Sequence, residues 1–264
     1  MFYNSFFCLL SFQKCYIQNI NNKLKGNIIM NIVKSHPAFN KLFINDTEHA
    51  IPMIIDAFKE NSENCAFDEF CQAIVKFADD YVNTGLRYEM PDHCSKEAIS
   101  SKIKGDIFEI LSMFVLQRIG SFHDVGVKEG TYKQIDDTED CGLDFYGVYG
   151  RDNSRRAFGQ VKFRNPNIPI NGENVPFSRI TKNKLAGEAC TEFGCDLNKD
   201  VLIFVTNVRA EDAMSISLKN VIGWTGTNPD RSHRYIKICD KLTFENIIGY
   251  NSFSFWEEFR KCFE

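Results

Sequence analysis

The chain has 264 residues, of which 44% are hydrophobic, and proline is scarce at 7 residues. This length and composition fit one large domain or two small ones with a sizeable core, and they exclude a disordered or a fibrous protein. The formal net charge of −4 excludes a nucleic-acid binder that works through bulk charge, so any contact with DNA must come from a local basic patch.

Residues 1–29 contain a short apolar stretch that Asn, Ser, Gln and Lys side chains interrupt. The stretch is too short and too broken for a transmembrane span, and it lacks the basic n-region and the cleavage site of a signal peptide. We expect a peripheral extension, with a packed first helix or strand as the alternative. The protein is expected to be cytoplasmic and to make no contact with a membrane.

Residues 30–95 have the periodicity of amphipathic helices. The clearest run extends from Phe67 to Tyr81, where apolar residues recur at spacings of three and four. A stretch that contains Pro91 then ends the pattern. We therefore predict a helical region over residues 30–95, followed by a domain over residues 96–264.

The second part of the chain alternates between helical and strand-like patterns. In chain order, the sequence predicts a helix at 96–120, strands at 122–130, 143–150 and 155–164, a helix at 178–194, a strand at 200–208, a helix at 211–220, a strand running into a loop at 235–244, and a terminal helix at 253–263. The residues RDNS at 151–154 predict a turn that joins the second and third strands into a hairpin. This order is that of an α/β fold.

Ten cysteines are scattered along the chain, and no two of them form a CxxC pair. This distribution is typical of reduced thiols, several of which fill the core of a cytosolic protein. A zinc site assembled from distant Cys and His residues stays open as an alternative.

A basic patch is predicted between Arg151 and Lys184, where eight basic residues face only two acidic ones. Such a patch is either a solvated surface or a place where the phosphates of DNA are held. Its closeness to the candidate catalytic residues favours the second interpretation.

Those candidates fit the hydrolysis of a phosphodiester, which needs a metal held by oxygen ligands and a lysine near the attacking water. Asp144 begins one predicted strand, and Gln160 and Lys162 lie on the next. Residues i and i+2 of a strand share a face, so Gln160 and Lys162 point together while Val161 points into a core. If the hairpin forms, Asp144 lies across from them, and Glu109 of the preceding helix can reach the cluster.

This arrangement resembles the PD-(D/E)XK nuclease superfamily, or restriction-endonuclease-like fold, and within it the Mrr-like branch, whose motif is D…QxK. The matching segments are Gly105–Glu109, Gly142–Asp144, Gln160–Lys162 and Leu202–Thr206. The resemblance covers roughly residues 100–225. It implies a restriction-endonuclease-like core over residues 96–264, a mixed central sheet flanked by helices, with the helical region in front of it.

By this resemblance Asp144 is the principal metal ligand, and the backbone carbonyl of Val161 completes the metal's ligand shell. Gln160 stands where most relatives have an acid, so it can ligate through its amide oxygen without neutralising charge. Glu109 then supplies the missing negative charge, directly or through a water, and Lys162 orients the attacking water. Each residue also has a structural alternative: a solvated helix position for Glu109, a turn cap for Asp144 and an exposed spacer for Gln160.

The function implied is a Mg²⁺-dependent DNA endonuclease, with Mn²⁺ as a possible substitute, of the restriction type or directed by DNA structure. Its substrate would be double-stranded DNA, cut by a homodimer, and the phosphate contacts would come from Arg164, Arg179, Lys182 and Lys184. The sequence has no P-loop, so any ATP use would require a separate helicase or methyltransferase partner. The alternatives are a catalytically inactive nucleic-acid-binding module of the same fold and a nuclease subunit that acts with a helicase.

Overall fold

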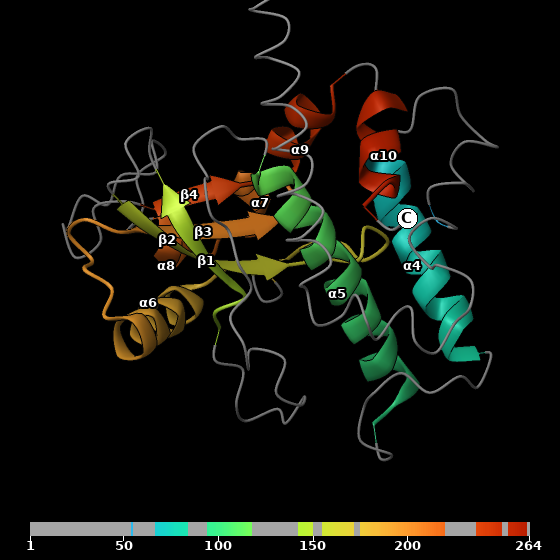
Figure 1. Ribbon diagram of the computed structural model, residues 1–264. Coiled ribbons are helices and arrows are strands. Elements are labelled where there is room, and N and C mark those ends of the chain that lie inside the picture. Colours follow the sequence, from blue (N-terminus) through green and yellow to red (C-terminus); the bar gives the residue numbers. More distant parts are fainter. Residues whose placement is uncertain are drawn as a thin grey trace, which may run out of the picture.

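The structure, a computed structural model, describes residues 54, 67–83, 94–117, 142–149, 155–171, 175–219, 236–249 and 253–262. The elements in chain order are α4 (Phe67–Asn83), α5 (Lys96–Leu116), β1 (Phe145–Tyr149), β2 (Arg155–Lys162), α6 (Arg179–Phe193), β3 (Val201–Thr206), α7 (Ala210–Ala213), α8 (Ile216–Lys219), β4 (Ile236–Cys239), α9 (Lys241–Ile248) and α10 (Phe253–Arg260) (Figure 1). No helix in these ranges is long and apolar enough to cross a membrane.

The described strands form one mixed sheet in the order β1-β2-β3-β4. β1 and β2 pair in antiparallel fashion, with Phe145 opposite Gly159, so the predicted hairpin is confirmed. β2 and β3 are parallel, as are β3 and β4. The prediction of an α/β fold with a mixed sheet and flanking helices is therefore confirmed, and the restriction-endonuclease-like topology stays a prediction.

Helices cover both faces of this sheet. Ala157, Val161 and the odd-numbered residues of β3 join one buried cluster with α4, α5, α9 and α10. Phe158 and Phe204, which point the opposite way, join a second cluster with α6. In Figure 1, α6 lies to the lower left of the strands and α5, α4 and α10 lie to their right. All six residues of β3 are buried, as expected of a strand covered on both faces.

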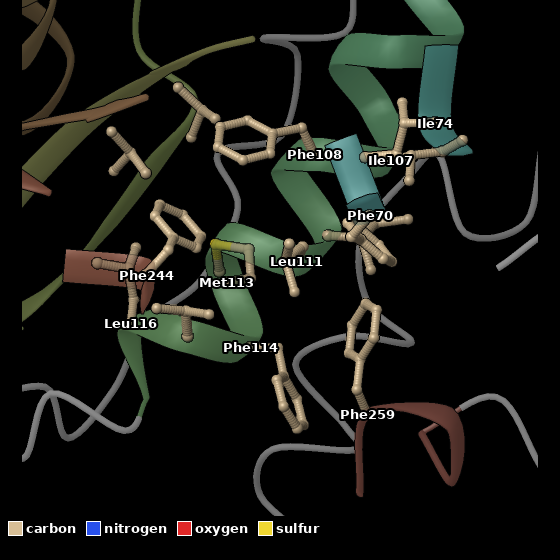
Figure 2. Packing of buried hydrophobic residues seen from close by; sticks show 14 of the residues in the cluster. Phe70, Ile74, Ile107, Phe108, Leu111, Met113, Phe114, Leu116, Phe244 and Phe259 are labelled. Atoms are coloured by element: carbon tan, nitrogen blue, oxygen red, sulfur yellow. The ribbon is translucent and has the colours of Figure 1, made fainter. Parts of the chain in front are cut away.

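Helix α4 confirms the helical pattern predicted around residues 67–81, and it packs directly on α5. Phe70 stacks on Trp256 of α10, with ring centroids 4.5 Å apart. The Phe259 ring of α10 lies 6.2 Å from that of Phe70 and 4.9 Å from that of Phe114 in α5, and Figure 2 shows Ile74 of α4 beside Ile107 of α5. The described part of the region 30–95 thus shares one hydrophobic core with the domain that follows it.

Three local predictions differ from the structure. Residues 241–248 form α9 instead of a loop, because the Asp240 side chain accepts the backbone N–H of Thr243 and caps the helix. The helix expected at 211–220 is two short helices, interrupted where Met214 bridges to Phe177. The long helix α5 ends at Leu116, four residues before its predicted end.

The first predicted strand (122–130), the RDNS turn and the extension 1–29 lie outside the described residues. All six cysteines within the described residues are free thiols. Burial raises the pKa of Cys239 to about 12, so this thiol is protonated and inert at neutral pH. This agrees with the prediction of reduced cysteines that fill the core.

The close approach of Phe145 to Gly159 gives a stability prediction. A methyl group at Gly159 would overlap the Phe145 ring, which lies against the glycine across the hairpin. Gly159→Ala should lower the free energy of unfolding by about 1–3 kcal/mol through overpacking, as measured by denaturant titration.

Gly187 provides the matched control, because it lies on the exposed side of α6 with nothing within 4 Å of the added methyl. Gly187→Ala should stabilise the protein by about 0.5–1 kcal/mol through helix propensity. Equal effects of the two substitutions would contradict the packing described for Phe145.

Candidate active site

Asp144 lies at the entrance to β1, beside the end of β2. Its backbone N–H donates to the carbonyl of Gly159 at 2.8 Å. Its carboxylate Oδ2 accepts the backbone N–H of Val161, in a short hydrogen bond. The structure therefore brings Asp144 next to the Gln160–Lys162 segment, as the hairpin predicts, and one carboxylate oxygen extends the hydrogen bonding of the sheet beyond β1.

The side chains at the end of β2 alternate between the two faces of the sheet, as expected. Val161 belongs to the core on the α5 face. Gln160 is paired in register with Phe204, whose side chain belongs to the core on the α6 face, and Lys162 is paired with Thr206. Gln160 and Lys162 thus share the α6 face of the sheet, and Lys162 is half-buried.

Two oxygen atoms at this end of the sheet are buried without a hydrogen-bond partner among the described residues. They are Oε1 of Gln160, a residue that is 1% exposed, and Oγ1 of Thr206, which is fully buried. Buried polar atoms are nearly always hydrogen-bonded, so each unpartnered oxygen requires an explanation such as a water or an ion. The predicted role of Gln160 as an oxygen ligand would provide one.

Gly142 allows the chain to pass close to this cluster. Its φ is +75°, a conformation that favours glycine. A Cβ there would lie 3.3 Å from Nε2 of Gln160 and 3.5 Å from Cβ of Lys184. The same contacts place the exposed Lys184 of α6 near the strand end, where a phosphate contact was predicted.

Helix α5 presents three charged residues on one face. Lys102, Asp106 and Glu109 follow the spacing i, i+4, i+7. Asp106 is completely buried and forms an ion pair with Lys102, whose side chain is 20% exposed. Glu109 is half-buried.

The pKa of Lys102 links this face of α5 to Asp144. Burial alone would lower the pKa, but the charges of Asp106, Glu109 and Asp144 outweigh it, and the pKa is raised. Lys102 and Asp106 did not emerge from the sequence motifs. The spacing K-x-x-x-D-x-x-E on a helix next to the motif could have identified them.

The basic residues expected to contact phosphates differ in their placement. Arg179 and Lys184 are exposed on α6, as that role requires. Lys182 is only 3% exposed, which corrects the expectation of a surface phosphate contact. The reason is helical periodicity: Lys182 shares a face with the buried Leu185 and Ala189.

Two other polar groups near α6 serve the fold. Ser178 and Thr181 form a capping box at the start of the helix, so their side chains are engaged there. Arg156 donates to the last carbonyls of α6, Phe193 at 2.7 Å and Gly194 at 2.8 Å, and it pairs with the buried Asp200 at 2.7 Å. Arg156 thus caps a helix C-terminus, which reduces the predicted basic patch.

Arg164 follows the candidate lysine by two residues, and its position is well fixed. Its backbone N–H and C=O bind the side-chain amide of Asn207, both at 2.7 Å. Its guanidinium donates to the carbonyl of Val175 at 3.2 Å, and burial lowers the pKa of the group. Asn207, which follows β3, thus has a structural role.

Oxygen atoms are the ligands available for a metal at this site. No group of three or more His, Cys, Asp or Glu residues gathers in the described part of the chain. Mg²⁺ keeps several waters and needs only one or two carboxylates. The carboxylate of Asp144, the amide oxygen of Gln160 and the carbonyl of Val161 fit that requirement as a donor set.

The buried ion pair of α5 gives a prediction on stability. Lys102→Met leaves the carboxylate of Asp106 buried without its cation, which should lower the free energy of unfolding by about 3 kcal/mol. Since the folded state raises the pKa of Lys102, its contribution is complete below the unfolded pKa and is lost as pH rises through the folded value. The free energy of unfolding of the parent should exceed that of Lys102→Met by a constant amount from about pH 7 to about pH 9. This difference should shrink above about pH 10.

Helix α4 offers the control, because Lys76 and Asp80 form an i,i+4 pair with both side chains exposed. Lys76→Met should change the free energy of unfolding by less than about 0.5 kcal/mol. Chemical unfolding over a pH series measures both variants, and similar losses for Lys102 and Lys76 would contradict a stabilising role for the buried pair.

Comparison of the chain with known protein families, with curated proteins and with solved structures found no match. The resemblance noted in the sequence therefore stands on the motif residues themselves. Any proposal of function has to be built from the arrangement of Asp144, Gln160, Val161 and Lys162.

Proposed function

We propose that the protein is a Mg²⁺-dependent endonuclease that hydrolyses phosphodiester bonds in DNA. The observation that supports it is the juxtaposition of the Asp144 carboxylate with Gln160, whose buried oxygen has no partner among the described residues. Lys162, on the same face as Gln160, supplies the lysine that such a site needs.

Asp144, the amide oxygen of Gln160 and the carbonyl of Val161 would hold the metal, and Mn²⁺ would serve in place of Mg²⁺. When bound, the ion would neutralise charge on the scissile phosphate and favour ionisation of a bound water. Glu109 adds negative charge from α5. It lies near Asp144, because both carboxylates raise the pKa of Lys102. This addition matters because a neutral Gln160 contributes none.

The protein's own side chains would carry out the rest of the proposed hydrolysis. Lys162 orients the attacking water and stabilises the charge that develops on the phosphorane oxygens. Arg179 and Lys184, exposed on α6, hold neighbouring phosphates and fix the register of the DNA without reading its sequence. Arg164, the other residue expected to contact a phosphate, lies beyond the end of β2.

The substrate proposed is double-stranded DNA, cut either at a recognition sequence or at a structural feature. Cleavage of both strands by one site per chain calls for two copies, so the working form would be a homodimer. A separate helicase or methyltransferase chain would supply any step that depends on ATP or methylation.

A second candidate is a nucleic-acid-binding module of the same fold without catalysis. Two observations favour it: Asp144 already accepts the N–H of Val161, and Gln160 brings no charge. An assay of cleavage separates the two functions.

The first test is plasmid nicking with Mg²⁺ or Mn²⁺. Asp144→Ala removes the principal ligand and Lys162→Ala removes the water-orienting amine, so each should lower the nicking rate by at least about 100-fold. The rate is followed as conversion of supercoiled to open-circular and linear DNA on gels.

Exposed residues outside the site provide matched controls. Asp212→Asn in α7 and Lys199→Gln, whose side chain is 78% exposed, should keep the parent rate. Full activity in Asp144→Ala and Lys162→Ala would refute the site. A parent protein that binds DNA but cleaves no form of it would favour the binding module.

The second test addresses metal binding directly. Gln160→Glu adds a carboxylate at the proposed ligand position, so the affinity for Mn²⁺ should rise by about tenfold. Isothermal titration or the electron paramagnetic resonance signal of free Mn²⁺ measures this without any cleavage. Asp144→Ala should abolish the site, and an affinity unchanged in both variants would show that the metal binds elsewhere.

A further inference from the structure

A cavity lies close to the end of β2, on the side of α4 and α5. It has a volume of about 610 Å³ and opens between the end of α4, the first turns of α5 and the segment 163–170 that follows β2. This volume is within the range of small-molecule sites in proteins. The proposed nuclease mechanism does not use this cavity.

The lining has three basic residues, and Arg164 among them forms no ion pair with a carboxylate of the described residues. Lys104 pairs with Asp79 at 2.8 Å, and that carboxylate also accepts the hydroxyl of Ser100 at 2.6 Å. Lys96 and Glu97, neighbours in the first turn of α5, add one charge of each sign to the lining. The three basic residues therefore exceed the two carboxylates of the lining, Asp79 and Glu97, by one positive charge.

The guanidinium of Arg164 has donor capacity left over. One terminal nitrogen donates to Val175 at 3.2 Å, and a guanidinium has five N–H donors in all, so further N–H groups remain for a ligand. The clamp of Asn207 on the Arg164 backbone fixes where this group can reach. An arginine held in this way, with a planar set of N–H donors, is suited to a phosphate group.

The cavity also has an apolar wall. Phe163, Ile168, Ile170 and Val82 line it, and Ile168 is 57% exposed. The Phe163 ring is supported from behind by Phe108, with centroids 5.4 Å apart. A flat aromatic group can pack on such a wall, because stacking tolerates any π-face.

The cavity is held in shape by a turn tied to α4. Asn165 accepts the backbone N–H of Asn167 on its side chain at 2.9 Å, and its carbonyl accepts the N–H of Ile168 at 3.0 Å. Gln72 of α4 donates to the Asn167 side chain at 3.1 Å. The apolar wall and Arg164 are therefore positioned on one segment in advance of any ligand.

We propose that this cavity binds a nucleotide, with the phosphate on Arg164 and the base against Phe163 and Ile168. The nucleotide is either part of the DNA next to the cleaved bond or a free mononucleotide. The first source rests on the proposed nuclease function, and the second does not.

The experiment uses the full chain with EDTA present, so that catalysis has no influence. Isothermal titration compares a deoxynucleoside monophosphate, the matching deoxynucleoside and inorganic phosphate. The monophosphate should bind best, and Arg164→Gln should weaken it by about tenfold, to the level of the nucleoside. Ser101→Trp, at an exposed helix position on the rim, should block the monophosphate and the nucleoside alike by filling the cavity.

Thermal unfolding of each variant establishes that it is folded, and Lys199→Gln serves as the distant control with unchanged affinity. The proposal would be overturned if the parent did not bind the monophosphate at concentrations up to about 10 mM. Parent-like binding in both Arg164→Gln and Ser101→Trp would overturn it as well.

A competition experiment identifies the source of the nucleotide. Displacement of a labelled mononucleotide by short DNA duplexes or single strands assigns the cavity to the DNA substrate. Displacement by free nucleotides alone assigns it to a small-molecule ligand. Lys162→Ala should bind the mononucleotide with the affinity of the parent and should lose nicking activity. If the nuclease proposal fails, nicking is absent while binding persists; if the cavity proposal fails, binding is absent whether or not the parent nicks DNA.

Discussion

The candidate site depends on one hydrogen bond, from the backbone N–H of Val161 to the carboxylate of Asp144. Asp144 precedes β1, so its side chain continues the hairpin's hydrogen bonding where the strand itself has not begun. A carboxylate bound in this way cannot move relative to the residues that flank Val161. The distance from Asp144 to Gln160 and Lys162 is thereby fixed by the sheet and not by flexible side chains, which is the rigidity that a catalytic site requires.

Local patterns in the sequence are sufficient to predict this part of the molecule. The period of two along residues 155–162 and the turn signal before them define the hairpin, and the hairpin places Asp144 beside Gln160. The apolar run at 201–206 likewise predicts a strand covered on both faces. These features depend on neighbours in the chain, so a single sequence contains the information.

Other parts depend on contacts between distant segments, which no local pattern contains. Arg156 looks like one more residue of a basic patch, yet it caps α6 because Asp200 lies 44 positions along the chain and close in space. Lys182 counts as a charge in the sequence, while the packing of Leu185 against the sheet turns it inward. Such residues change the electrostatics of the site, since a basic patch inferred from composition overstates the charge that DNA would meet.

Helix α5 separates two chemical environments that the end of β2 connects. One side of the helix presents Lys102 and Glu109, within electrostatic range of Asp144, and about a quarter of a turn away Ser101 lines the cavity beside Arg164. The segment 161–164 reaches both environments. It is held at one end by Asp144, through Val161, and at the other by Asn207, through the backbone of Arg164. Two clamps only three residues apart leave this segment little freedom, so the position of Lys162 and the direction of Arg164 are determined together. A ligand that engages Arg164 therefore acts on a backbone continuous with Lys162, and this gives the cavity a physical route to the strand end where cleavage is proposed.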